Sequence, residues 1–135
     1  MPWQFNRTEA VFLQIARRLR NDILTGKYPQ DRQFPPVRQL AAEAAVNPNT
    51  MQKALLQLER EGLLYARGTV GRFVTTDSAV LAEARERMRR ETVRSLLAEA
   101  RALGITKAEL IQFIEEEEQQ DGASGTGLQK SAEKL

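Results

Sequence analysis

The sequence has no cysteine and no histidine among its 135 residues. The absence of cysteine excludes disulfide bonds, thiolate metal sites and a thiol nucleophile. The absence of histidine removes the commonest general base and the commonest zinc ligand. The remaining residues form no recognisable catalytic spacing. We therefore predict a protein that is not an enzyme and that needs no metal and no cofactor.

Long apolar runs are missing as well. A membrane-spanning helix needs about 18 or more consecutive apolar residues, and no segment approaches that length. The N-terminal segment, which includes Arg7, lacks the layout of a signal peptide. These absences predict a cytoplasmic protein without a membrane partner. A hydrophobic content of 41% in 135 residues is enough for one small domain with an appendage.

The charge is unevenly distributed, although the net charge of the whole chain is only +2. Residues 1–75 carry 11 Lys/Arg and 6 Asp/Glu, a net charge of +5. Residues 76–114 have a net charge of +1, and residues 115–135 have a net charge of −4. A local excess of positive charge favours a polyanionic partner through counterion release. The N-terminal part is therefore the candidate for binding such a partner.

Within this basic part, the segment 46–62 has the signals of a helix with both ends marked. Asn47 can cap the first free backbone N–H groups, and Pro48 suits the first helical position. Gly62 can end the helix in a left-handed conformation. Between these ends, an apolar stripe recurs at helical spacing and should face a core; its members are Met51, Ala54, Leu55 and Leu58.

The opposite face of this helix carries amide, hydroxyl and ammonium groups, with no carboxylate before Glu59; its members are Asn49, Thr50, Gln52, Lys53 and Gln57. These groups match the edges of DNA bases and the oxygens of phosphates. The pattern favours a DNA-reading helix. For this segment taken alone, the alternative is an ordinary amphipathic helix whose polar face is solvated.

Two helices are predicted before this segment. A core helix extends from its cap Thr8 to Thr25, and a proline-containing connector leads to a short helix over residues 36–45. Arg38 lies in the first turn of the short helix, where the helix dipole opposes a cation, so a phosphate or a guanine edge would explain it. The alternative is an exposed arginine without a role. The short connection to the 46–62 helix predicts a helix-turn-helix.

A β-hairpin is predicted after Gly62, with strands over residues 63–67 and 72–75 and a turn that has glycine at both ends. Arg67 and Arg72 lie at the base of this turn, and Gly71 would permit close approach of a backbone. This arrangement suits a minor-groove or phosphate contact by a wing. The alternative is a hairpin that only completes the core.

The C-terminal part predicts two amphipathic helices, one over residues 78–103 and one that starts with a capping box at Thr106 and Glu109. Because two such helices bury their apolar faces poorly alone, we expect them to pair with a second subunit in a two-fold dimer. The predicted dimer residues are apolar: Leu81, Met88, Leu96, Leu97, Leu103, Leu110, Ile111, Phe113 and Ile114. Folding back onto the first domain is the alternative.

An acidic run follows, from Glu115 to Glu118. Four consecutive carboxylates point around a helix in different directions, so the run predicts a solvated face and not a metal site. Residues 121–135, rich in glycine and serine, are predicted to be a disordered tail.

Several motifs occur in an order that resembles the winged helix-turn-helix of GntR-family bacterial transcription regulators, and the Asn-Pro-Asn-Thr sequence with the short helical C-terminal part resembles the YtrA subfamily. The resemblance covers about residues 8–118 and is carried by segments 34–41, 46–54, 58–63 and 71–74. It assigns major-groove DNA contact to Arg38, Asn49, Thr50 and Gln52, and the wing tip to Gly71. We add Lys53, from its charge, as a phosphate contact.

This chain departs from the family pattern at three places. Asp31 replaces a frequent glycine, Pro36 replaces a frequent serine, and the wing lacks the usual basic residue followed by Gly-x-Gly. The departure in the wing concerns the residues that would contact DNA there.

The expected fold class is mostly α with a small β-hairpin. We expect a winged helix-turn-helix DNA-binding domain over residues 1–76, a two-helix dimerisation region over residues 77–120, and the tail. The resemblance implies a homodimeric repressor of an inverted-repeat operator in double-stranded DNA, and it implies control of a transporter operon. The dimer helices leave room for an unidentified small-molecule effector, although nothing in the sequence demands one. The alternative is a winged-helix module that binds a protein and does not read DNA.

Overall fold

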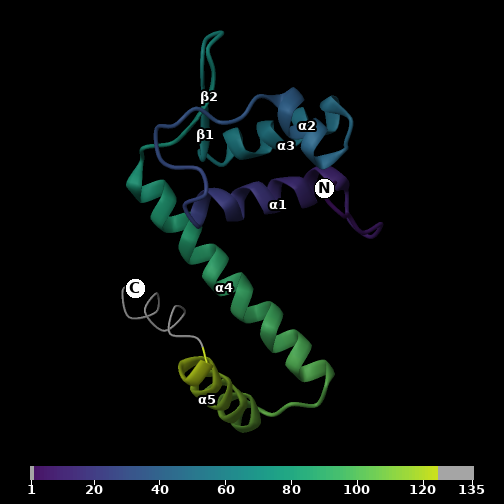
Figure 1. Cartoon of the computed structure of the whole chain (residues 1–135), viewed down its shortest axis with the longest axis vertical. Coiled ribbons are helices and arrows are strands. Elements are labelled where there is room, and N and C mark those ends of the chain that lie inside the picture. The colour runs from purple at the N-terminus through teal and green to yellow at the C-terminus, as the bar shows by residue number, and fades with distance from the viewer. Residues whose placement is uncertain (1, 125–135) are drawn as a thin grey trace. The chain divides into compact units, whose positions relative to one another are not determined.

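The structure is a computed structural model and describes residues 2–124. Its elements, in chain order, are α1 (Val11–Leu24), α2 (Val37–Ala44), α3 (Pro48–Arg60), β1 (Leu64–Arg67), β2 (Gly71–Val74), α4 (Ser78–Ala102) and α5 (Lys107–Ser124) (Figure 1). The predicted fold class, mostly helical with one β-hairpin, is confirmed. The chain divides into two compact units, the first ending at Arg89 and the second beginning at Arg90.

The core of the first unit lies between α1, α2 and α3. Both α1 and α2 pack on α3. The predicted apolar stripe of α3 is buried as expected, and it is joined by the apolar sides of the other two helices; the fully buried members are Ile15, Leu19, Leu40, Met51, Leu55 and Leu58. Burial of such a side chain stabilises the fold by about 1.5 to 3 kcal/mol. One face of α3 is therefore fixed, and its opposite face is left for other contacts.

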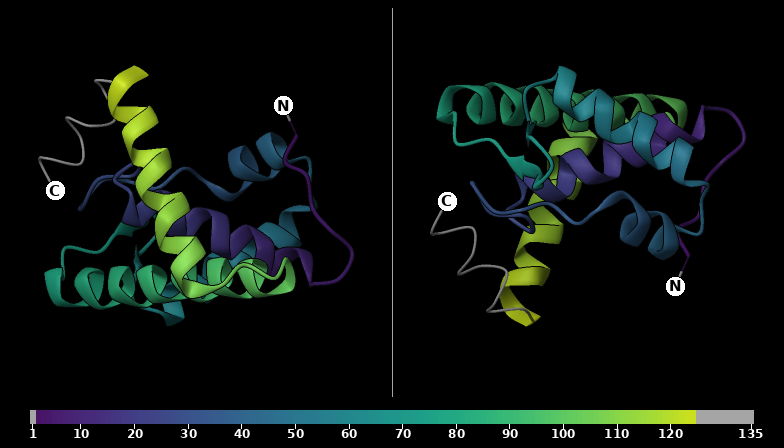
Figure 2. Two further views of the ribbon diagram at one scale, coloured as in Figure 1. Left: turned by 90° about the horizontal axis from the view of Figure 1, so that it is seen from below. Right: turned by 90° about the horizontal axis from the view of Figure 1, so that it is seen from above.

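A tight turn joins α2 to α3 (Figure 2). Ala45 adopts a left-handed conformation, with φ of 58°, and the N–H of Val46 donates to the carbonyl of Ala41 at 3.0 Å. The side chain of Asn47 then accepts a hydrogen bond from the N–H of Asn49 at 2.8 Å, and Pro48 is the first helical residue. The predicted cap and the predicted helix-turn-helix connection are both present.

Two predicted helix starts are wrong by a few residues. The first helix begins at Val11 and has no side-chain cap, because its N-cap residue is Ala10, which has no polar side chain. The Thr8 hydroxyl donates to Asn6 Oδ1 at 2.9 Å. The second begins at Val37, because Pro36 has an extended backbone, with ψ of 157°, and contributes only its carbonyl to the first turn.

The hairpin pairs β1 and β2 antiparallel, with Leu64 opposite Val74 at the base and Arg67 opposite Gly71 near the turn. Leu64 and Val74 are buried in the core, which anchors the base of the hairpin. The connector before α2 lies along β2, where the N–H of Phe34 donates to the carbonyl of Arg72 at 2.7 Å. The hairpin is thus held by the core and by the connector, and it projects from the helices as a wing (Figure 1).

The first turns of α4 belong to the first unit, which therefore extends beyond the predicted boundary at residue 76. Leu81 and Ala84 are buried in the core, Met88 packs against it, and Arg85 Nε donates to the carbonyl of Leu24 at 3.0 Å. The prediction that Leu81 serves a dimer is corrected here, because its side chain is only 2% exposed within a single chain.

The second unit contains the rest of α4 and α5. The predicted capping box is present, since Glu109 N–H donates to Thr106 Oγ1 at 3.2 Å and Thr106 N–H donates to Glu109 Oε1 at 3.0 Å. The last helix extends to Ser124, so the predicted tail begins four residues inside a helix; residues 125–135 lie outside the described part.

For residues 2–124, the structure can be compared with two expectations: that no helix spans a membrane and that the acidic run forms no metal site. No helix in this range has the length and apolar character needed to cross a membrane. Acidic side chains in the same range, including the run Glu115–Glu118, do not form a group of three or more that could hold a metal ion.

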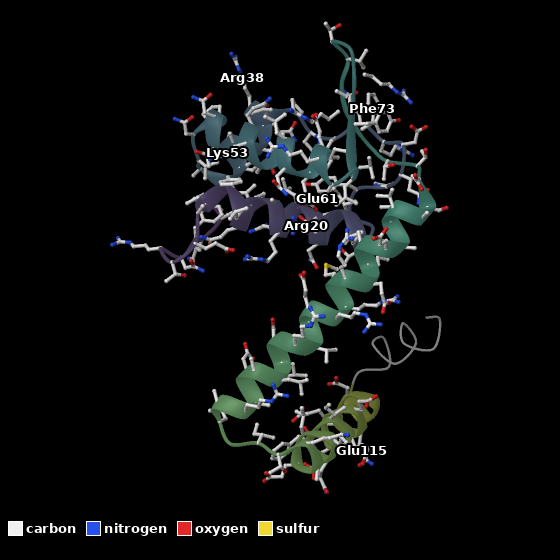
Figure 3. The ribbon with its side chains drawn as sticks, turned by 180° about the vertical axis from the view of Figure 1, so that it is seen from behind. Arg20, Arg38, Lys53, Glu61, Phe73 and Glu115 are labelled. Atoms are coloured by element: carbon white, nitrogen blue, oxygen red, sulfur yellow. The ribbon has the colours of Figure 1, made fainter. Side chains whose placement is uncertain are left out.

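An ion pair joins α1 to the end of α3: Arg20 Nε lies 2.7 Å from Glu61 Oε1, and Arg20 Nη2 lies 2.6 Å from Glu61 Oε2 (Figure 3). Burial, the largest single influence, raises the pKa of Glu61. The hydrogen bonds from Arg20 and Gln57 and the charges of Arg20 and Arg87 together outweigh it, so the pKa lies below its ordinary value of 4.5.

This ion pair predicts a loss of stability in acid. A carboxyl whose pKa is lower in the folded than in the unfolded state contributes stability above its unfolded pKa and loses it as the pH falls through the folded pKa. We expect the free energy of unfolding, measured in urea between pH 7 and pH 3, to fall less below pH 4.5 in Glu61→Gln than in the wild type. Arg20→Met should also reduce the acid dependence. An unchanged slope in both variants would contradict the assignment.

Candidate nucleic-acid interface

Arg38 and the N-terminal residues of α3 form the part of the predicted site that is open to a partner. The side chains of Arg38 and Asn49 are exposed and that of Thr50 is half-buried. Among residues 2–124, none of these three side chains has an intramolecular hydrogen bond or ion pair. In Figure 3, Arg38 points away from the helices on the side toward which the hairpin projects. The first turn of α2 and the wing therefore face the same direction.

The backbone at the start of α3 is already satisfied. The side chain of Asn47 accepts a hydrogen bond from the N–H of Asn49. The carbonyl of Asn47 accepts from the N–H groups of Thr50 and Met51 at 3.0 and 3.1 Å. The first free donors of the helix are therefore occupied. Side chains, and not backbone N–H groups, are left to contact a partner at this end of the helix.

Arg72 of the wing contacts the polar face of α3. Its Nε lies 2.6 Å from Glu59 Oε1, and its Nη1 lies 3.3 Å from Gln52 Oε1. The side chain of Arg72 is only 17% exposed. The structure thus brings together two predicted site residues, Gln52 and Arg72, and adds Glu59, the first carboxylate on this face. In the free protein, Arg72 therefore already binds two side chains of α3.

Lys53, unlike the other predicted contacts of α3, lies against α1. Its Nζ is 4.3 Å from the centre of the Phe12 ring of α1, a cation–π contact. The side chain remains exposed, so the assignment of Lys53 to a phosphate stays a prediction. No signal in the sequence pairs Phe12 with Lys53.

Arg67 of the wing is held by residues from three segments. Its Nη2 lies 3.1 Å from Asp31 Oδ1 and 3.0 Å from the hydroxyl of Tyr65, and its guanidinium is 4.4 Å from the centre of the Phe73 ring. The Tyr65 hydroxyl also donates to Asp31 Oδ1 at 2.7 Å, and this hydrogen bond is the main reason that the pKa of Tyr65 is raised. We call Asp31, Tyr65, Arg67 and Phe73 the wing cluster.

Asp31 could have been suspected from the sequence, because it stands where the resemblance expects glycine. Its backbone keeps the conformation that glycine favours, with φ of 58°, a region that side chains other than Asn and Asp rarely adopt. Gly71, the predicted wing-tip residue, has φ of 136°, and a Cβ there would lie 3.0 Å from Gln33 Nε2. Gln33 Nε2 donates to the carbonyl of Val70 at 3.0 Å, so the turn is supported from the connector.

Comparison of the sequence with known proteins identifies the family of this chain. A sequence profile described as "Bacterial regulatory proteins, gntR family" matches residues 12–74. The uncharacterized HTH-type transcriptional regulator YhcF of Bacillus subtilis is 30% identical over 116 residues, which are 82% of this chain and 92% of YhcF. The chain belongs to the GntR family. It is therefore a DNA-binding transcription regulator, and not an enzyme, as the sequence analysis predicted.

Two further regulators resemble the chain beyond the residues that the profile matches. The HTH-type transcriptional repressor YtrA of Bacillus subtilis is 29% identical over 107 residues, which cover 78% of this chain and 82% of YtrA. A GntR family transcriptional regulator from Listeria monocytogenes has a solved structure that matches with a TM-score of 0.74 and 26% identity, over 83% of this chain and 98% of that one. The winged helix-turn-helix with a C-terminal helical region is confirmed, as is the YtrA-like resemblance.

Proposed function

We propose that this GntR-family regulator is a repressor that binds an inverted-repeat operator as a homodimer and excludes polymerase from a promoter. The observation that carries the proposal is the common direction of Arg38 and the wing, beside the N-terminal turn of α3 (Figure 3). A recognition helix enters the major groove with its N-terminal residues at the base edges, while the preceding helix crosses the backbone. Arg38, Asn49, Thr50 and Gln52 are the proposed base-reading residues, and Lys53, Arg67, Gly71 and Arg72 the proposed flanking contacts.

The apolar surface of the second unit supports the dimer. Of the nine large apolar side chains that are exposed among residues 2–124, six lie between residues 93 and 114: Val93, Leu96, Leu103, Ile111, Phe113 and Ile114. A concentration of exposed large apolar side chains in one part of a small protein is typical of an interface. We assign this face to a second copy of the chain, because two-fold pairing of regulators matches the symmetry of an inverted repeat. Leu97 and Leu110 are half-buried and would lie at its margin.

The sign of regulation rests on similarity. YtrA, one of the related proteins, is described as a repressor. Control of a transporter operon is the implication of the YtrA-like resemblance noted in the sequence, and a small-molecule effector between the dimer helices would be compatible with the proposal. We place the protein in the cytoplasm, where its DNA target would be.

The experiment that tests the proposal is selection of bound duplexes from a random DNA library by the purified protein at moderate salt. Enrichment of one inverted repeat would establish specific dimeric recognition and would identify the operator. Absence of enrichment at all salt concentrations would contradict the proposal and favour the alternative, a winged-helix module that binds a protein partner.

The salt dependence of binding gives a separate prediction. Each phosphate that Lys or Arg neutralises releases counterions, so log K falls with log salt with a slope of about −0.9 per phosphate. We expect a linear decrease for the selected operator, measured by fluorescence anisotropy, and a smaller slope for Lys53→Ala. A slope near zero would rule out a phosphate-dominated contact, and an unchanged slope in Lys53→Ala would remove that residue from the interface.

A further inference from the structure

The contact between Arg72 and Gln52 determines which atoms of Gln52 remain available for DNA. Arginine carries only hydrogen-bond donors, so the one atom of the Gln52 carboxamide that it can bind is the carbonyl oxygen. The observed pair agrees with this chemistry, since Arg72 Nη1 lies 3.3 Å from Gln52 Oε1. A flipped carboxamide would place an NH2 group against a guanidinium, which neither group could satisfy. The orientation of the Gln52 side chain is thus fixed by the identity of its neighbour.

Glu59 holds Arg72 in this position. Its carboxylate accepts from Arg72 Nε at 2.6 Å, and the two side chains are only 17% and 26% exposed. Gln52 and Glu59 are seven residues apart, so they lie on one face of α3 two turns from each other. The guanidinium spans the two, donating from Nε to Glu59 and from Nη1 to Gln52. This geometry suits arginine, because its N–H donors are fixed in one plane on separate nitrogens, whereas a lysine ammonium is a compact point charge.

The carboxamide atom of Gln52 that does not bind Arg72 is the amide nitrogen, Nε2, which carries two N–H donors. Among residues 2–124, Gln52 Nε2 has no hydrogen-bond acceptor. An unrestrained glutamine pairs with adenine, because its oxygen accepts from N6 while its nitrogen donates to N7. That pairing needs both atoms directed at the base. A carboxamide whose oxygen points at Arg72 must break that contact before it can pair with adenine in this way.

Guanine presents two acceptors, O6 and N7, on its major-groove edge, and it needs no acceptor from the protein. We propose that Arg72 sets the base preference of Gln52, making it a donor-only reader that selects guanine over adenine at the base it contacts. The inference rests on the proposed DNA-reading function of α3. Arg72 acts here as a positioning residue, through Gln52 and not through a contact of its own with the base.

The test is duplex selection with four forms of the full chain: wild type, Gln52→Ala, Arg72→Lys and the double variant Glu59→Gln/Arg72→Met. Gln52→Ala identifies the base that Gln52 reads, as the position in each half-site where selectivity disappears. Arg72→Lys keeps the charge and the ion pair with Glu59 but releases Gln52. The double variant releases Gln52 without leaving a carboxylate unpaired, so a folding defect in one variant does not prevent the test.

We expect guanine at that position in the wild type and a shift of about tenfold toward adenine in the two variants that release Gln52, the ratio that corresponds to about 1.4 kcal/mol for one base contact. The base preference assigned to Arg38 should not change, which a general distortion of the domain would not allow. Adenine in the wild type, retained guanine in both variants, or no position affected by Gln52→Ala would overturn the inference. If the wild type enriches no sequence, the proposed function itself fails, and this outcome is distinct from the others.

Discussion

Replacing Ile111 and Ile114 together by aspartate is expected to convert the protein from a dimer to a monomer and to weaken operator binding by about a hundredfold or more. Both side chains are exposed in a single chain, at 47% and 42%. They are three residues apart on α5, so they share one side of that helix. Burying two carboxylates in an apolar interface without partners is costly, and it prevents association. Loss of the second half-site then removes an avidity that typically amounts to about 10² to 10⁴.

The measurements for this prediction are sedimentation equilibrium for the oligomeric state and anisotropy titration for the affinity. A control variant, Gln112→Asp with Gln119→Asp, adds the same two charges to exposed positions on another side of the same helix and should remain dimeric. Since neither change touches the core of the first unit, thermal unfolding of that unit should be retained. A double variant that stays dimeric would exclude this face of α5 from the interface. A monomer with undiminished affinity would contradict recognition of two half-sites.

Arg38→Ala should reduce the affinity for the selected operator by about 1 to 3 kcal/mol, the usual value of a good bidentate base contact. The guanidinium is exposed and lacks an intramolecular partner among the described residues, so its removal leaves no unpaired group in the free protein. The loss on random DNA should be much smaller, because a base contact contributes little there. The measurement is the ratio of the two dissociation constants at one salt concentration.

Two variants sharpen the result for Arg38. Arg38→Lys keeps the charge but loses the planar fork, so it should resemble the alanine variant on the operator and the wild type on random DNA. Arg60→Ala removes one positive charge at the opposite end of α3 and should have little effect on either DNA. Equal losses on both DNAs in Arg38→Ala would make Arg38 a phosphate contact. An operator affinity that is unchanged in Arg38→Ala would support the alternative that Arg38 is an exposed arginine without a role in binding.

The fold was largely predictable because its signals are local. The cap at Asn47, the proline after it and the apolar spacing of α3 depend on residues within two helical turns, and the structure has all three. The capping box of α5 is equally local. The boundary of the first unit was not predictable, because it depends on where Leu81 packs, and periodicity alone does not say which partner an apolar side chain meets.

The candidate site was predictable as a set of residues but not as a set of contacts. Sequence patterns named Gln52, Arg67 and Arg72 from their chemistry and their place on helix or hairpin. Their partners come from segments up to 36 residues away, such as Asp31 for Arg67. Distances of this kind follow from tertiary packing, and a single sequence does not encode them in any repeating pattern. The sequence therefore indicated which residues are polar and exposed, but not which of them are already paired.

The wing cluster has a consequence for how the wing contributes to binding. Arg67 already has the carboxylate of Asp31, the hydroxyl of Tyr65 and the ring of Phe73 as neighbours. A phosphate that approaches this arginine must either share it with the carboxylate, against the repulsion of two like charges, or displace the carboxylate. The net gain from such a contact is the difference between two ion pairs, and not the full strength of one. A DNA contact through Arg67 would therefore replace one ion pair by another, and the carboxylate at position 31 would limit the free energy gained.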